Sequence, residues 1–286
     1  MYARPVVHFH SKAELGSYGP PSGRGTAVSV REAYLKCNAY SKRVSRAGLS
    51  LVAPFRYLPL PYCGSSMAGF FISFEGIEGS GKSTQMTLLA QALRSQGYEV
   101  VLTREPGGTP AGQVLRRLLL ESSSSPLALG AELLLMLADR AQHVQEVVAP
   151  ALQANKIVLS DRFMDSTTAY QGYGRGVELT FLARLNAFAC SGCVPALTFV
   201  LDLPVTEGLR RTRQRQGNTE TADRFEAESV AFHERVRTGF LEVARADTKR
   251  VHIITAVRPV EVVHQEILTI VQDRLAGGAH PSTGPS

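Results

Sequence analysis

Hydrophobic and polar positions fall into alternating blocks from Phe70 onward. Short apolar runs are followed by longer segments in which apolar residues return every three to four positions. The short runs predict strands at residues 70–75, 99–103, 156–160, 197–201 and 251–254. The longer segments predict helices at residues 82–96, 111–120, 131–154, 178–189, 205–215, 226–246 and 259–274. Strands that alternate with helices are typical of a parallel sheet, so an α/β fold is expected.

Residues 1–66 show neither the periodicity of a helix nor that of a strand, and they are rich in Ser, Gly, Pro and Arg. They carry nine Lys and Arg residues against two acids, whereas the 22 basic residues that follow are balanced by 23 acidic ones. The net charge of +6 therefore comes from this segment, and the nearly neutral remainder gives no support for nucleic-acid binding. The segment is expected to be disordered, an organellar targeting segment, or a stretch before a translation start at Met67.

The domain organisation follows from these changes in pattern. We expect an extension over residues 1–66, one globular domain over residues 67–276, and a flexible Gly- and Pro-rich tail over residues 277–286. No apolar run is long enough to cross a bilayer. The four cysteines do not form the disulfide framework of a small secreted domain. A cytoplasmic protein without a membrane partner is expected.

The strongest chemical signal lies between the first predicted strand and the first predicted helix. It has the form G-x-x-x-x-G-K-[ST], and it consists of Gly76, Ile77, Glu78, Gly79, Ser80, Gly81, Lys82 and Ser83, followed by Thr84. Glycines in such a loop let backbone N–H groups surround phosphate oxygens at the amino end of a helix. The Lys82 ammonium would reach the β- and γ-phosphates, and the Ser83 hydroxyl would bind Mg²⁺. The motif predicts a nucleotide-binding P-loop.

Two classes of P-loop protein are disfavoured because their elements are missing. Asn155 and Lys156 run directly into a predicted strand, and they do not begin the Asn-Lys-x-Asp element of GTPases. The sequence also lacks the Leu-Ser-Gly-Gly-Gln segment of transporter ATPases. A kinase for a small acceptor and a regulatory ATP-hydrolysing protein are the alternatives that remain.

Charged residues also follow the second and third predicted strands. Arg104 follows the second strand, and Asp161 and Arg162 follow the third. Ligands of α/β sheets bind at the carboxyl ends of the strands, so these side chains are expected near the P-loop. Arginine suits a phosphate acceptor through its forked hydrogen bonding. Asp161 suits Mg²⁺, held directly or through water, although it could instead cap the following segment.

Several short segments in the same order resemble one known family. They are T-R-E-P-G-G-T-P at 103–110, D-R-F at 161–163, A-Y-Q-G at 169–172 and D-R-F-E at 223–226. Together with the P-loop they closely resemble bacterial-type thymidylate kinases, which are P-loop nucleoside-monophosphate kinases, over about residues 67–275. The resemblance implies a three-layer sandwich with a parallel sheet of about five strands, helices on both faces and a mobile lid at about 207–225.

The resemblance also implies a reaction. The protein would transfer the γ-phosphoryl group of ATP to dTMP, giving dTDP and ADP in dTTP synthesis, with Mg²⁺ as cofactor. It would act as a homodimer and would bind neither nucleic acid nor membrane. Another nucleotide or nucleoside kinase, which differs only in its acceptor, is the alternative.

The family pattern, carried onto this sequence, implies the residues that bind dTMP. They are Glu78, Arg104, Met136, Arg140, Arg162, Tyr170 and Gln171. The three arginines would hold the acceptor, Glu78 would contact the sugar or order the phosphate site, and Tyr170 and Gln171 would contact sugar and base. Met136 stands where the family usually has a Phe or Tyr stacked on thymine, so the preference for thymine is in question.

The family closes lid arginines over ATP, and this P-loop contains no arginine of its own. Phosphoryl transfer needs positive charge on the equatorial oxygens in the transition state. Arg211, Arg213 and Arg215 are the candidates to supply it, and Arg211 and Arg215 would share one helix face. The expected catalytic residues are therefore Lys82, Asp161 and these three arginines, with Ser83 and Asp161 as metal ligands.

Overall fold

The computed structural model describes residues 69–121, 126–216 and 224–277. These residues contain five strands, β1 (Phe70–Glu75), β2 (Val100–Arg104), β3 (Ile157–Asp161), β4 (Leu197–Asp202) and β5 (Val251–Thr255). All pairs are parallel, and the strand order is β2-β3-β1-β4-β5. The predicted strands are confirmed, with bounds that differ by at most one residue. The predicted extension over residues 1–66 and residues 278–286 of the predicted tail lie outside the described residues, and Gly277 belongs to the last helix.

Helices connect the strands and follow the last one. They are α2 (Lys82–Ser95), α3 (Pro110–Leu120), α4 (Leu129–His143), α5 (Ala149–Gln153), α6 (Met164–Thr167), α7 (Leu179–Cys190), α8 (Val205–Gln216), α9 (Val230–Ala246) and α10 (Val260–Gly277). Two π-helical segments, η1 (Val144–Val148) and η2 (Thr168–Gly174), follow α4 and α6. No helix in the described part of the chain combines the length and apolar character that a membrane span requires.

Three helix predictions need correction. The single helix predicted over 131–154 is interrupted by η1, because Pro150 has no N–H for the helix ladder and its ring clashes with the preceding turn. The helix predicted from residue 226 begins only at Val230, where the Ser229 hydroxyl accepts a hydrogen bond from the Phe232 N–H. The helical segment 164–174 was not predicted, since its Ser, Thr and Gly residues are weak helix formers and packing against α9 stabilises it.

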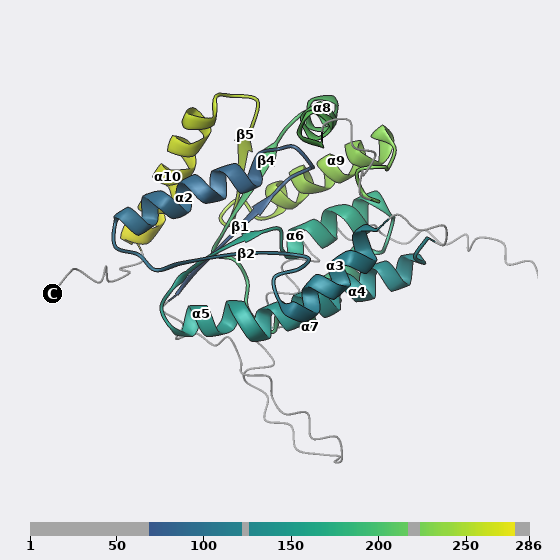
Figure 1. Cartoon of the computed structure of the whole chain (residues 1–286), viewed down its shortest axis with the longest axis horizontal. Helices are drawn as coiled ribbons and strands as arrows, with labels where there is room; N and C mark the ends of the chain where they lie inside the picture. Colours follow the sequence, from purple (N-terminus) through teal and green to yellow (C-terminus); the bar gives the residue numbers. More distant parts are fainter. Residues whose placement is uncertain (1–68, 122–125, 217–223, 278–286) are drawn as a thin grey trace, which may run out of the picture.

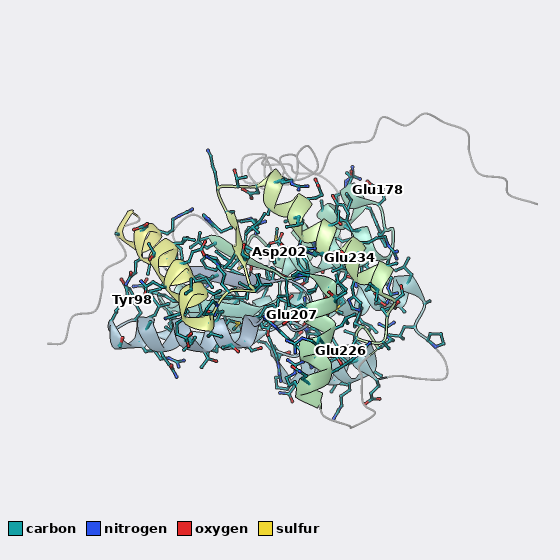
Figure 2. The ribbon with its side chains drawn as sticks, turned by 90° about the horizontal axis from the view of Figure 1, so that it is seen from above. Tyr98, Glu178, Asp202, Glu207, Glu226 and Glu234 are labelled. Carbon is teal, nitrogen blue, oxygen red and sulfur yellow. The ribbon has the colours of Figure 1, made fainter. Side chains whose placement is uncertain are left out.

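Side chains of β1 alternate between two cores. Phe70, Ile72 and Phe74 pack with α2 and α10, whereas Phe71 packs with η1, α5 and the end of α7. Figure 1 shows α2 and α10 on one side of the sheet and α3, α4, α5 and α7 on the other. Figure 2 shows the same molecule from above, with α10 alongside α2 and with Glu207 of α8 and Glu234 of α9 away from that pair. The layers confirm the predicted α/β sandwich.

The register of the sheet brings the ends of three strands together. Phe74 of β1 lies beside Asp161 of β3, and Arg104 of β2 lies on the other side of Asp161. The P-loop leaves β1 one residue after Glu75. The residues expected at the strand ends therefore meet at one edge of the sheet, as ligand sites of α/β folds do.

A buried ion pair joins the segment after β3 to the start of β5. The Arg250 Nη1 and Nη2 atoms donate to the two Asp165 carboxylate oxygens at 2.7 and 3.0 Å. The Arg250 Nη1 atom also donates to the Thr198 hydroxyl on β4 at 2.8 Å. Asp165 is fully buried, so its charge depends on these donors.

Replacement of Arg250 by methionine should lower the free energy of unfolding by about 3–5 kcal/mol, because it removes one charge of a buried ion pair and both of its hydrogen bonds to Asp165. Urea denaturation at pH 7 measures the change. Arg245→Met is the control, because Arg245 pairs with Glu242 on the exposed face of α9 and such pairs contribute about 0–1 kcal/mol. Equal losses in the two variants would contradict the structural role of the buried pair.

Candidate functional site

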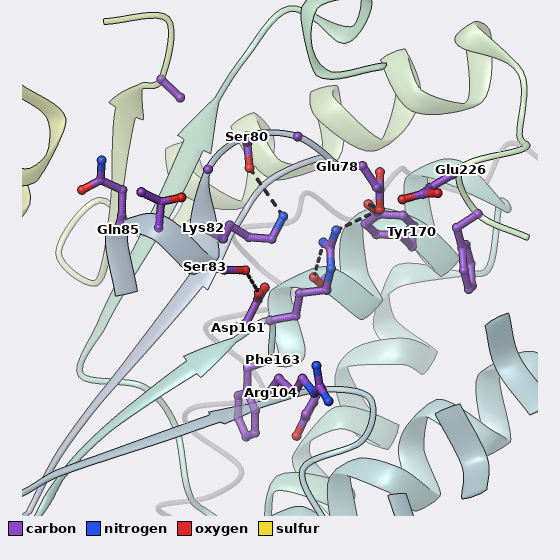
Figure 3. A pocket seen from close by; sticks show the side chains of 18 of the residues that line it. Glu78, Ser80, Lys82, Ser83, Gln85, Arg104, Asp161, Phe163, Tyr170 and Glu226 are labelled. Atoms are coloured by element: carbon purple, nitrogen blue, oxygen red, sulfur yellow. Dashed lines mark hydrogen bonds and ion pairs between the residues drawn. The ribbon is translucent and has the colours of Figure 1, made fainter. Parts of the chain in front are cut away.

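A cavity of about 940 Å³ lies at the carboxyl ends of β1, β2 and β3. Its walls come from the P-loop, the segment after β2, helices α4 and α8, residues 161–171 and the segment after β5. Figure 3 shows side chains from these segments pointing toward one another across it. Most residues predicted from the sequence to form the site line this cavity, whereas Gly76, Ile77 and Arg213 do not.

The P-loop is packed tightly against α8. Gly79 has a positive φ of 73°, and a Cβ atom there would lie 2.3 Å from the Gly208 carbonyl oxygen. Both the backbone conformation and the close approach therefore require glycine at position 79. This contact places the first turns of α8, which begin the predicted lid, directly over the phosphate loop.

Lys82 lies at the centre of the loop. Its Nζ atom donates to the Gly76 and Ile77 carbonyl oxygens at 3.1 and 3.0 Å and to the Ser80 hydroxyl at 3.4 Å. Burial, together with the nearby Arg162, lowers the pKa of Lys82 to about 8, although Asp161 acts in the opposite direction. A buried ammonium group with too little negative charge around it is well suited to receive an anion.

Ser83 and Asp161 form a pair of oxygen ligands beside the loop. The Ser83 hydroxyl donates to the Asp161 Oδ2 atom at 2.9 Å, as Figure 3 shows. No three His, Cys, Asp or Glu side chains gather into a metal site within the described ranges. Hydroxyl and carboxylate oxygens are the ligands that Mg²⁺ prefers, and this ion usually takes its other ligands from water and phosphates. The two residues therefore fit a Mg²⁺ ion that enters with a nucleotide.

Arg162 is directed back over the P-loop by its backbone. Its φ of 70° is left-handed, which is uncommon for a residue with a side chain. The Nη2 atom donates to the Glu78 Oε1 atom at 2.9 Å, and the Nη1 atom donates to the Gly76 carbonyl oxygen at 2.9 Å. The guanidinium carbon also lies 5.0 Å from the centre of the Tyr170 ring. Arg162 is thus fixed between the P-loop and the opposite wall.

Glu78 accepts two hydrogen bonds through one oxygen. Besides Arg162, the Tyr170 hydroxyl donates to the Oε1 atom at 2.5 Å. Burial alone would raise the pKa of Glu78, but Arg162, Lys82 and the Tyr170 hydroxyl outweigh burial and lower the pKa. Glu78 is therefore a carboxylate at neutral pH, available to accept a hydrogen bond from a ligand hydroxyl.

Arg104 and Arg116 add positive charge on the side of β2. Arg104, the last residue of β2, is exposed and lines the cavity, as Figure 3 shows. Arg116 of α3 also lines the cavity, and its Nη1 atom donates to the Pro106 carbonyl oxygen at 2.9 Å. Arg116 was not predicted as a site residue, because the periodicity of a short amphipathic helix does not reveal which polar residue faces a ligand.

Arg140 is deeper than the other two predicted acceptor arginines. Its Nε atom donates to the Glu105 Oε2 atom at 2.9 Å, and its Nη2 atom lies 2.9 Å from the same oxygen in an ion pair. Its Nη1 atom donates to the Thr167 hydroxyl at 2.9 Å and to the Asn186 Oδ1 atom at 2.6 Å. These hydrogen bonds use three of the five guanidinium N–H groups. Arg140 is a rigid part of the cavity wall.

The remaining predicted acceptor residues line the same wall. Met136 is half-buried and lines the cavity, whereas its neighbour Leu137 packs in a separate core with Leu133. Tyr170 and Gln171 come from η2 and also line the cavity. The π-helical segment that was not predicted thus carries two of the predicted site residues.

The three predicted lid arginines differ in position. Arg211 lines the cavity, and its Nε and Nη1 atoms donate to the Glu207 Oε1 atom at 2.7 Å and the Ala256 carbonyl oxygen at 3.3 Å. Arg215 also lines the cavity, and its side chain is 69% exposed. Arg213 is exposed and is not among the lining residues. Residues 217–223 of the predicted lid lie outside the described part of the chain.

Known proteins with similar sequences and structures share one activity. A profile of the thymidylate kinase family matches residues 74–267. The thymidylate kinase of Geotalea uraniireducens is 49% identical over 212 residues, which cover 73% of this chain and 100% of the relative. The thymidylate kinase of Desulfovibrio desulfuricans is 52% identical over 196 residues, which cover 68% of this chain and 90% of the relative.

A solved structure agrees with these relatives. The crystal structure of thymidylate kinase from Ehrlichia chaffeensis matches with a TM-score of 0.58 and 37% identity, over 71% of this chain and 99% of that protein. The family profile covers more than half of the chain, and the matched segment holds the P-loop and the whole cavity wall described above. The chain belongs to the thymidylate kinase family, whose members transfer a phosphoryl group from ATP to dTMP in dTTP synthesis.

Proposed function

We propose that the cavity binds ATP and dTMP together and aligns their phosphates between the P-loop and Arg162. The observation that supports this proposal is the convergence of Lys82, Arg104 and Arg162, which reach one space from three different elements. Two phosphate groups bring several negative charges together, and cationic side chains held on rigid elements would offset their repulsion.

The donor occupies the P-loop in this proposal. The N–H groups of the loop and the amino end of α2 would bind the ATP phosphates, with Lys82 at the β- and γ-phosphates. The proposed ATP site is formed by Gly76, Ile77, Glu78, Gly79, Ser80, Gly81, Lys82, Ser83 and Thr84. Ala256, Val257 and Pro259 line the cavity after β5 and offer an apolar surface for the adenine ring.

The acceptor occupies the opposite wall. Arg104 and Arg162 would hold the dTMP phosphate through forked hydrogen bonds. The Glu78 carboxylate would accept a hydrogen bond from the deoxyribose 3′-hydroxyl, and Tyr170 would close the space that a ribose 2′-hydroxyl needs. Arg140 and Gln171 would contact the edge of the thymine ring, and Met136 would lie against its face.

The transfer itself forms a bond between an oxygen of the dTMP phosphate and the γ-phosphorus, while the bond from that phosphorus to the β,γ-bridging oxygen breaks. Lys82, Arg211 and Arg215 would stabilise the charge that spreads over the γ-phosphate oxygens. Mg²⁺, which Ser83 and Asp161 would hold, neutralises phosphate charge when it is bound. The residues otherwise orient the two phosphates and exclude water.

We also propose a homodimer. Helices α3, α4 and α7 pack side by side, and each exposes large apolar side chains. The residues concerned are Val114, Leu118, Leu134, Phe181 and Phe188. Contiguous exposed apolar surface of this kind marks protein interfaces, and a second copy of the chain would bury it.

The proposed reaction can be tested with four acceptors in the presence of ATP and Mg²⁺. Chromatography should show dTDP and ADP formed in equal amounts from dTMP. Turnover of dUMP should be about 10–200-fold less efficient, because one methyl group against Met136 gives limited discrimination. The monophosphates dCMP and dGMP should be poorer still. ADP formation at the same rate with and without acceptor would instead favour a hydrolysing regulatory protein.

The lid arginines give a second test. Arg211→Met or Arg215→Met should lower kcat by about 10³-fold or more in at least one variant, as expected for an arginine that contacts transferring phosphoryl oxygens. The KM for dTMP should change little, because these residues would not contact the acceptor. Arg213→Met is the matched control on the same helix and should stay within about threefold of the unchanged protein. If all three variants remain within threefold, the proposed role of the lid is wrong.

The oligomeric state provides a third test. Leu134 is 63% exposed on α4, and Leu134→Glu should convert a dimer into a folded monomer because it places a charge in the apolar interface. Light scattering after size exclusion measures the mass. Val262→Glu is the control, since Val262 is also exposed but lies on α10, on the other side of the sheet. A Leu134→Glu variant that remains dimeric would place the interface elsewhere.

A further inference from the structure

Glu132 is a buried carboxylate that the phosphoryl-transfer reaction does not use. It lies in the first turn of α4, and only 2% of its surface is exposed. The Arg224 Nη1 atom lies 2.9 Å from its Oε2 atom, and the Arg175 Nη2 atom lies 3.3 Å from the same oxygen. The Gln171 Nε2 atom donates to its Oε1 atom at 2.9 Å, and the Arg175 Nε atom donates to the same oxygen at 3.4 Å. Two cations and one amide therefore share this carboxylate.

The carboxylate determines which way the Gln171 amide faces. Glu132 forms ion pairs with two arginines, and a carboxylate oxygen paired in this way accepts hydrogen bonds and cannot donate one. The side of Gln171 that faces Glu132 must therefore be its NH₂ group. This conclusion follows from the chemistry of the partner and does not depend on how the amide oxygen and nitrogen are assigned.

The opposite side of the amide is left for the cavity. Gln171 is 1% exposed, and it lines the cavity. Because its nitrogen donates to Glu132, its carbonyl oxygen is the group available to a bound molecule. The cavity, which Arg140 also lines as a hydrogen-bond donor, thus offers a fixed acceptor at Gln171.

Pyrimidine bases differ in whether N3, the atom that such an acceptor would contact, carries a hydrogen. Thymine and uracil carry a hydrogen on N3 and can donate it to a carbonyl oxygen. Cytosine has an unprotonated N3 atom, so two acceptors would face each other in a buried site. An unsatisfied pair of this kind strongly disfavours binding, far more than the loss of one apolar contact.

We propose that Glu132 is a positioning residue that sets base specificity, because it holds the Gln171 carbonyl oxygen toward the cavity and so selects bases with an N3–H donor. This inference rests on the proposed function, since it requires the base of the acceptor to lie at Gln171. Glu132 acts through Gln171 and does not contact the substrate.

The substitution Glu132→Gln would reverse the orientation of the Gln171 amide. The new side chain should keep its carbonyl oxygen toward Arg224 and the Arg175 Nη2 atom, because a cation attracts the acceptor end of an amide. The contacts on that side, at 2.9 and 3.3 Å, are shorter than the 3.4 Å contact of the Arg175 Nε atom on the other side. Its NH₂ group would then face Gln171, and the Gln171 amide would turn to accept from it. The cavity would receive an NH₂ donor in place of a carbonyl oxygen, which matches N3 of cytosine.

The experiment measures kcat/KM for dTMP, dUMP and dCMP in the unchanged protein and in Glu132→Gln. The ratio of kcat/KM for dTMP to kcat/KM for dCMP should fall by at least about tenfold. The variant removes the buried polar mismatch with cytosine and creates one with thymine. The ratio of dTMP to dUMP should stay constant, since both bases carry N3–H. A loss of packing would lower all three values without this pattern.

Arg175→Gln is the matched control. Arg175 belongs to the same ion-pair cluster through Glu132 and Glu228, but its removal leaves the contact between Gln171 and Glu132 in place. Base selectivity should therefore stay within about threefold of the unchanged protein. Glu132→Gln combined with Arg175→Gln restores the charge balance of the cluster, and it serves as the test protein if the single variant does not fold.

The outcomes separate the two proposals. Turnover of dTMP with an unchanged dTMP to dCMP ratio in Glu132→Gln, or an equal fall in Arg175→Gln, overturns the role of Glu132 alone. Absence of dTMP turnover in the unchanged protein overturns the proposed function and this inference together. A fall in the ratio confined to variants of Glu132 supports the inference.

Discussion

The parallel register of β1, β2 and β3 is the constraint on which the site depends. Asp161 pairs with Phe74 on one side and with Arg104 on the other, so three strands end along one line. Every segment that leaves this line starts from the same edge of a rigid sheet. The phosphate loop, the acceptor arginines and the metal-binding carboxylate can therefore meet without a long flexible loop between them.

Buried carboxylates hold this arrangement from behind. Glu75 accepts hydrogen bonds from the Phe163 N–H at 2.8 Å and from the Ser166 hydroxyl at 2.6 Å, which fixes the segment after β3. Glu105 fixes Arg140, and Glu132 holds Gln171. Burial, together with Asp165, raises the pKa of Glu75 to about 8, which shows how unfavourable a charge is at that position. The buried acidic groups that position the cavity wall thus lower the free energy of unfolding, and packing of the surrounding core offsets this loss.

The sequence predicts the parts of the site that depend on local pattern. The P-loop and the charged residues at strand ends follow from short motifs and from the period of the flanking elements, and the sheet was predicted within one residue at each strand. Helix 164–174 could not be predicted, because packing against α9 stabilises a segment of weak helix formers. Arg116 and Glu132 were missed for a related reason. The role of Glu132 depends on a contact with Gln171, which is distant in sequence, and that of Arg116 depends on a cavity built from several distant segments. No local period encodes such contacts.

The proposed reaction requires that two nucleotide phosphates meet between Lys82 and Arg162. A crystal structure with dTMP, Mg²⁺ and a non-hydrolysable ATP analogue tests it most directly. We expect Arg104 and Arg162 to bind the dTMP phosphate, and we expect the γ-phosphate at Lys82, in line with an acceptor oxygen. A dTMP phosphate bound away from both arginines, or bound in the P-loop in place of ATP, would contradict it.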